Sequence, residues 1–156
     1  MLLAIDPGDV ESAWVIYDTE KKIPVLFAKE ENGNIIEKMA DFREQCGTLV
    51  IEMIASYGMP VGRSVFETCV WVGRYWQLWE SLGGKVELIY RKDVKMTLCH
   101  TMKAKDSNVR QAIMDRYGSS KDVAIGKKQT PGPLYGIVAD IWAALGVAIT
   151  WQEKTP

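Results

Sequence analysis

Two short apolar segments, each carrying one acid, constrain the fold of this chain most strongly. The first is residues 2–6 (LLAID), which Pro7 and Gly8 end, and the second is residues 48–54, which contain Glu52. Runs this short are typical of strands buried on both faces. A carboxylate there is costly to desolvate unless a cation pairs with it. Asp6 alone is compatible with a simple turn cap, whereas the second copy of the pattern favours two carboxylates that meet at one metal ion.

Length and composition indicate one ordinary globular domain over residues 1–156. The hydrophobic fraction is 47% and the charged fraction 25%, and no apolar run approaches the length of a membrane span. The first residues lack the basic segment and the cleavage site of a signal peptide. We therefore expect a cytoplasmic protein.

The residues that commonly bind zinc are scarce. Cys46, Cys69 and Cys99 are odd in number and widely spaced, and His100 is the single histidine. This predicts reduced thiols, with neither a disulfide framework nor a zinc site. Any metal must be held by oxygen atoms, which indicates Mg²⁺, with Mn²⁺ as a substitute.

Charge is polarised along the chain, although the net charge is only −1. Residues 1–60 hold 5 Lys/Arg against 11 Asp/Glu, whereas residues 91–128 hold 10 against 4. An acidic half with strand-borne carboxylates beside a basic half suits a metal-dependent enzyme that acts on a polyanion. On charge alone, the alternative that the lysines only solvate helices and a loop stays open.

The hydrophobic periodicity predicts an α/β fold with a mixed five-stranded sheet. We expect three antiparallel strands, then a helix, a parallel strand, a second helix and a parallel strand. The expected strands are residues 2–6, 10–17, 23–28, 48–54 and 86–90. The expected helices are 35–46, after a breaker at 32–34, and 64–82, 91–99, 108–117 and 138–152, with a loop over 118–136.

The helix over 64–82 carries three of the six tryptophans. Its predicted core stripe consists of Val65, Cys69, Val72, Trp76 and Trp79. Aromatic residues remain beside this stripe, and we interpret Trp71, Tyr75 and Trp79 as a candidate dimer face.

A third acid, Asp140, lies in the first turns of the final apolar helix. Phosphodiester hydrolysis at two divalent ions roughly 4 Å apart needs carboxylates that converge from different elements. Asp6, Glu52 and Asp140 are candidates for such a cluster, and carboxylates buried together are stable chiefly with metal bound. One acid per element is also a pattern that chance can supply.

The order of these motifs resembles that of the RuvC-like Holliday junction resolvases, within the ribonuclease H-like superfamily. The segments that carry the resemblance are LAIDPG around Asp6, VIE around Glu52, the Lys/Arg-rich middle, and ADIWAALGVAI from Asp140. The segments IASYGMPVG and AKDSNVRQA are similar, more narrowly, to the phage-encoded branch of that family. The resemblance covers nearly the whole chain.

The resemblance implies a magnesium-dependent endodeoxyribonuclease of DNA recombination that resolves four-way junctions as a homodimer. Asp6, Glu52 and Asp140 would be its metal ligands and catalytic residues, and the compartment would be the host cytoplasm. The family commonly carries a further acid one helical turn after Asp140, where this chain has Ala143. The second metal would then be weakly held or completed by another group. Asp9 and Asp106 are spare acids, although Asp106 or Ser107 also suits the N-cap of the helix over 108–117.

DNA contacts are expected in the basic region and in the loop after Glu52. Tyr57 and Met59 could stack on, or wedge between, bases at the junction centre, although Tyr57 folded back onto the core is an open alternative. Arg63 and Arg74 contact phosphate or solvate their helix. The candidate DNA-binding residues are Tyr57, Met59, Arg63, Lys95, Lys103, Lys105 and Arg110.

Two other functions compete with junction resolution. One is a related nuclease that acts on flaps, forks or RNA–DNA hybrids. The other is a protein that binds branched DNA without cutting it, because the further acid is absent.

Overall fold

The structure, a computed structural model that describes residues 1–156, is built around a five-stranded mixed sheet. The strands are β1 (Leu2–Asp6), β2 (Glu11–Asp18), β3 (Ile23–Glu31), β4 (Thr48–Met53) and β5 (Lys85–Tyr90). Their order in the sheet is β3-β2-β1-β4-β5. β1, β2 and β3 pair antiparallel, and β4 pairs parallel with both β1 and β5. This confirms the predicted topology, three antiparallel strands followed by parallel ones.

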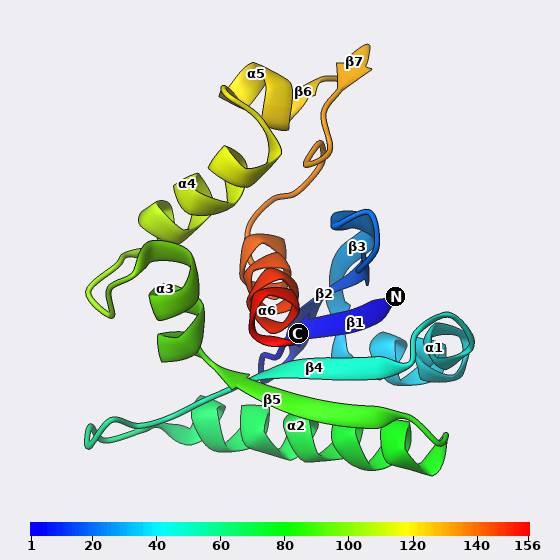
Figure 1. Cartoon of the computed structure of the whole chain (residues 1–156). Coiled ribbons are helices and arrows are strands. Elements are labelled where there is room, and N and C mark those ends of the chain that lie inside the picture. The colour runs from blue at the N-terminus through cyan, green and yellow to red at the C-terminus, as the bar shows by residue number, and fades with distance from the viewer.

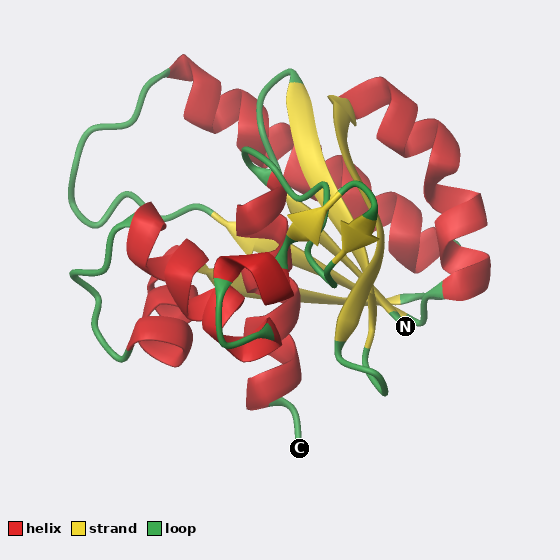
Figure 2. Ribbon diagram, turned by 90° about the horizontal axis from the view of Figure 1, so that it is seen from above, coloured by secondary structure: helices red, strands yellow, loops and turns green.

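Helices cover both faces of this sheet (Figures 1 and 2). One face packs against α1 (Asn32–Gln45) and α2 (Arg63–Ser81), and the other packs against α6 (Ile141–Lys154). Beyond α6 lie α3 (Arg91–Cys99) and α4 (Asp106–Tyr117), and α5 (Lys121–Ala124) follows α4. None of the helices combines the length and the apolar character needed to span a bilayer.

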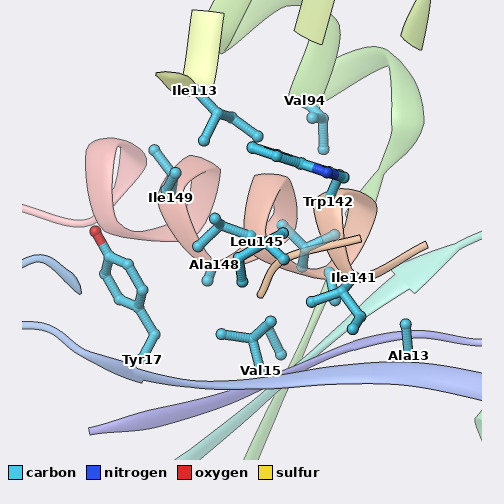
Figure 3. Close-up of a cluster of buried hydrophobic side chains, with 14 of the residues drawn as sticks. Ala13, Val15, Tyr17, Val94, Ile113, Ile141, Trp142, Leu145, Ala148 and Ile149 are labelled. Atoms are coloured by element: carbon cyan, nitrogen blue, oxygen red, sulfur yellow. The ribbon is translucent and has the colours of Figure 1, made fainter. Parts of the chain in front are cut away.

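The alternation of side chains along the strands divides the core into two clusters. On the face of α6, Ala13, Val15 and Tyr17 of β2 point toward Ile141, Leu145 and Ala148 (Figure 3). The other side of α6 carries Trp142 and Ile149 toward Val94 of α3 and Ile113 of α4. Because α6 is packed on two sides, nine of its residues are buried and its sequence is apolar almost throughout.

The core stripe of α2 differs from the predicted one. Its buried residues are Thr68, Val72, Tyr75 and Trp79, while Trp76 is only partly buried. Tyr75 and Trp79 are fully buried against the sheet of their own chain, so they are not available for a dimer face. Val72 and Trp79 are buried as predicted, whereas Thr68 and Tyr75 take the places expected for Cys69 and Trp76. The Tyr75 hydroxyl has a buried hydrogen-bond partner, a property that hydrophobic periodicity does not register.

Other element boundaries also differ. The expected breaker at 32–34 is instead the first turn of α1, since Asn32 is buried and its side chain ties the helix start to Gly8. The expected loop over 118–136 contains α5 and a two-stranded ribbon, β6 (Gly126–Lys127) and β7 (Thr130–Pro131). α4 begins at Asp106, with Lys105 rather than Asp106 or Ser107 at the cap position. These short features depend on specific side-chain and backbone contacts, which hydrophobic periodicity does not reveal.

Candidate active site

Asp6 and Glu52 lie on neighbouring strands at the same end of the sheet. β1 and β4 pair in parallel with Ile5 opposite Ile51, so the two acids are the next residues along. Ala4 and Val50, two residues earlier on each strand, pack into the cluster beneath α6. Because side chains alternate, Asp6 and Glu52 point to that same face. Parallel pairing thus brings together two acids that are 46 positions apart.

A buried polar network holds the turn that follows Asp6. The Gly8 amide donates to Ser12 Oγ at 3.1 Å, and the Asn32 side-chain amide donates to the Gly8 carbonyl at 2.9 Å. Asn32 Oδ1 in turn accepts from Ser12 at 2.6 Å and from the Tyr75 hydroxyl at 3.0 Å. A Cβ at position 8 would lie 2.2 Å from the Glu11 carbonyl oxygen, so only glycine fits there. The turn that presents Asp6 is therefore tied to β2, α1 and α2.

Asp140 approaches from the start of α6. It is the N-cap residue rather than part of the first helical turns, and its side chain is 56% exposed. Ala139 before it has φ of 48°, a left-handed conformation that is costly for a residue with a Cβ. The Asp140 Oδ2 atom accepts a hydrogen bond from Lys29 Nζ of β3 at 2.7 Å. The expectation of a carboxylate within a mostly buried helix is thus wrong in detail: the helix is buried, but its acid lies at the open end.

The electrostatics of the three acids are coupled. Burial, then the charges of Glu52 and Asp140, raise the pKa of Asp6 to about 8, against the opposing effects of Arg91 and Lys29. Burial also raises the pKa of Glu52 to about 6, although Arg91 lowers it. Carboxylates with raised pKa values lack full compensation by the protein. They are characteristic of sites where a cation or a substrate completes the environment.

The carboxylates do not form a closed set of metal ligands. Nowhere in the chain are three or more His, Cys, Asp or Glu side chains gathered closely enough to hold a metal ion. The chain's own cations approach two of the acids instead, Lys29 at Asp140 and Arg91 at Glu52. The charges of Glu52 and Asp140 thus both act on Asp6, while Lys29 pairs with Asp140 and Arg91 lies near Glu52.

Arg91 is a central residue that the sequence did not single out. Its Nη1 atom lies 3.9 Å from Glu52 Oε2, too far for a hydrogen bond, and both atoms are buried without a partner. Its Nη2 atom donates to Asp106 Oδ1. Arg91 follows β5 directly, at the sheet end where Glu52 lies. Its place after a parallel strand was the one available signal, since ligands commonly bind where such strands end.

A pocket of about 190 Å³ opens beside these residues. Its lining includes Arg91, Asp106, Arg110, Asp140, Trp142 and Ala143. The Arg110 guanidinium lies 5.5 Å from the Trp142 ring centroid, a distance at which cation–π attraction holds it near the pocket. The pocket thus combines acids with two arginines, a composition suited to a phosphate group and a cation together.

A second pocket, of about 200 Å³, lies on the other side of Arg91. Its lining residues are Tyr57, Arg91, Lys92, Lys95 and Met102. Tyr57 has φ of 49° and is 58% exposed, so the strained turn with Gly58 presents its ring outward rather than toward the core. This resolves the alternative in which Tyr57 folds back onto the core.

The remaining predicted DNA contacts are more dispersed. Arg110 lies at the first pocket and Lys95 at the second. Met59, Lys103 and Lys105 are exposed and line neither of these pockets. Arg63 pairs with Glu67 one helical turn along α2, at 2.7 Å. The structure thus brings Tyr57, Lys95 and Arg110 to the site region, and it leaves the other candidates on the surface.

Comparison with known proteins places the fold. The chain is similar to the solved structure of Thermus thermophilus RuvC, with a TM-score of 0.70 and 15% identity over 96% of this chain and 91% of that one. It is also similar to T. thermophilus RuvC in complex with a Holliday junction substrate, with a TM-score of 0.68 and 15% identity over 96% and 90%. No family model and no curated protein matches the sequence. The fold is therefore RuvC-like, of the ribonuclease H-like α/β type.

Proposed function

We propose that this protein is a divalent-metal-dependent, structure-selective DNA endonuclease that resolves four-way junctions by phosphodiester hydrolysis. The observation that carries the proposal is the electrostatic convergence of Asp6, Glu52 and Asp140 at one end of a RuvC-like sheet. Similarity to a RuvC bound to a Holliday junction substrate favours branched DNA. Its place in the phage-encoded branch rests on the sequence motifs alone.

The donor set fits Mg²⁺, with Mn²⁺ as a substitute. Carboxylate oxygens are what hard divalent cations prefer, and the site offers neither His nor Cys. Glu52 Oε2 is buried without a hydrogen-bond partner, and the Asp6 carboxyl carries a pKa of about 8 that a nearby dication would lower. Asp6, Glu52 and Asp140 would hold the metal. A cation bound there would supply the activated water and the stabilisation of the leaving oxygen that phosphodiester hydrolysis needs.

The protein's own cations are suited to bind the DNA backbone. Arg91 is fixed by Asp106 between the two pockets, so its guanidinium can engage a phosphate near the metal ligands without reordering. Phosphate contacts of this kind supply affinity and register, while the exposed Tyr57 ring offers a stacking surface for an unpaired base. The proposed DNA contacts are therefore Arg91 together with the residues expected from the sequence, Tyr57, Met59, Arg63, Lys95, Lys103, Lys105 and Arg110.

Paired nicks across a junction require two active sites, so we propose a homodimer. With Tyr75 and Trp79 buried in the core, the apolar surface of α2 that remains for a partner is Phe66, 63% exposed, and Val70, 61% exposed. Substitution Val70→Glu should then shift the sedimentation of the protein from dimer to monomer, and Glu67→Gln serves as the control. Monomeric wild-type protein at micromolar concentration would contradict the proposed dimer.

The activity is tested with Asp6→Asn and a four-way DNA junction. We expect Mg²⁺-dependent cleavage to fall at least about 10³-fold, because a ligand of the metal is lost, while binding of the junction in EDTA is retained. Asp9→Asn, in the same turn, is the matched control. Cleavage by Asp6→Asn at the wild-type rate would end the proposal.

The same protein samples also test the two alternative functions. A protein that binds branched DNA without cutting it would leave the wild type inactive with both Mg²⁺ and Mn²⁺, and the ion pair of Lys29 with Asp140 is the observation that favours it. A nuclease of different substrate preference would cut flaps, forks or RNA–DNA hybrids faster than junctions. Symmetrically paired nicks on a junction support the resolvase.

A further inference from the structure

Lys29 lies in a row with Asp6 across three strands of the sheet. Asp6 pairs with Ala13 of β2, and Ala13 pairs with Lys29 of β3. Directly paired residues point to the same face, so all three side chains lie on the face of α6. The Ala13 side chain, which lies between Asp6 and Lys29, is only a methyl group and leaves space above β2. The long Lys29 chain can therefore extend across β2 toward the carboxylates.

At the end of this chain, the Lys29 ammonium meets Asp140. Nζ lies 2.7 Å from Oδ2, and the two residues are 111 positions apart in the sequence. Lys29 is 36% exposed and belongs to an edge strand, so its side chain can reorient without disturbing the core. Arg91 contrasts with it, because Asp106 holds Arg91 in place and its side chain is only 23% exposed.

Resting on the function proposed above, we propose that Lys29 is a positioning residue that makes metal binding depend on DNA. In the free protein its ammonium holds the Asp140 carboxylate and competes with the divalent cation for it. A DNA phosphate that enters beside Arg91 gives the ammonium another partner. The Asp140 carboxylate is then free to bind the metal. The set of metal ligands is therefore complete only when substrate is present.

The energetics favour such a switch over a permanent ion pair. A salt bridge this exposed is worth little, so a phosphate can break it at small cost. A dication near the Lys29 ammonium is repelled by it, and when the ammonium moves onto a phosphate the negative charge of that phosphate offsets the repulsion. By linkage, DNA must then tighten metal binding by the same factor by which metal tightens DNA binding.

The test measures Mn²⁺ binding by electron paramagnetic resonance of the unbound ion, with the full chain. Lys29→Met removes the charge and keeps most of the stem. Lys21→Met removes one charge from an exposed lysine that forms no ion pair, in the turn after β2. We expect free Lys29→Met to bind Mn²⁺ about five- to tenfold more tightly than wild type, and Lys21→Met to match wild type. Asp6→Asn identifies the site, since it should abolish this binding.

The second arm adds a four-way junction with methylenephosphonate linkages around the branch point, which keep the charged oxygens but lack the scissile P–O bond. DNA should tighten Mn²⁺ binding by wild type about fivefold more than binding by Lys29→Met, and Lys29→Arg should retain most of the coupling. If Lys29→Met and Lys21→Met bind Mn²⁺ with equal affinity, and this binding still needs Asp6, the proposed role of Lys29 is overturned while the proposed metal site stands. Mn²⁺ binding that does not depend on Asp6, or no binding by any variant, would overturn the proposed metal site as well.

Discussion

The turn after Asp6 separates two groups of polar side chains that are built in opposite ways. On the face of α1 and α2, Asn32 Oδ1 accepts hydrogen bonds from the hydroxyls of Ser12 and Tyr75 at 2.6 and 3.0 Å, and all three residues are almost completely buried. On the face of α6, the carboxylates of Asp6 and Glu52 are partly buried with raised pKa values, and the buried Glu52 Oε2 atom lacks a partner.

The difference indicates that the first group stabilises the turn, whereas the second has the electrostatics expected of the proposed metal site. A satisfied buried network makes a single arrangement rigid, so removal of any member leaves others unpaired. Carboxylates without a compensating partner make the ligand-free protein less stable. Such a cost is typical of sites where a bound ligand supplies the missing partner. The rigid group therefore holds in place the group that is left unsatisfied.

The largest effect on stability is expected from Asn32→Ala. This change deletes both the acceptor shared by Ser12 and Tyr75 and the donor to the Gly8 carbonyl. The free energy of unfolding in urea should fall by about 2 to 4 kcal/mol. Asn34→Ala, at an exposed position of the same helix, should change it by less than about 0.5 kcal/mol. Similar values for the two variants would contradict the role of the network.

In EDTA, Asp6→Asn is expected to raise the free energy of unfolding rather than lower it. Replacing a carboxyl whose pKa burial raises to about 8 by a neutral amide removes a buried charge at pH 8 and above. The metal-free protein should gain stability on the order of 1 to 3 kcal/mol in urea denaturation at that pH. A loss of stability would show that the Asp6 charge is already compensated by the protein.

The pH dependence of stability sharpens this point. The pKa of Asp6 is about 8 in the folded protein against 3.8 for an ordinary carboxyl, so the folded state binds the proton more tightly. The contribution of Asp6 to stability is complete below about pH 4 and is lost as the pH rises through 8. In EDTA, the stability advantage of Asp6→Asn over wild type should grow across this window and then level off. A pH-independent difference would contradict the raised pKa.

Tyr75→Phe should give the smallest effect of this series. The ring stays buried beneath the sheet, and Asn32 Oδ1 keeps its hydrogen bond from Ser12. The expected loss is about 1 kcal/mol, which thermal denaturation at constant pH can measure. A loss as large as that of Asn32→Ala would place the hydroxyl, rather than the amide, at the centre of the network.

Much of the fold could be predicted from the sequence because hydrophobic periodicity reports burial directly. Short apolar runs bounded by turn residues identified all five strands of the sheet, the helical period identified α2, and the long apolar stretch identified α6. The boundaries at Asn32 and Asp106 were missed because side-chain hydrogen bonds and ion pairs determine them. The α5 turn and the β6–β7 ribbon are too short to show a period.

The sequence by itself determined which elements exist and which of them carry an acid, since burial and turn chemistry are local properties of a chain. Only the tertiary structure decided that Lys29 and Arg91 reach those acids, because β3 and the end of β5 come to the site through strand register. It also decided that Tyr75 turns inward to Asn32 and that Asp140 remains exposed. Pairing between distant side chains depends on three-dimensional proximity, which no local pattern encodes.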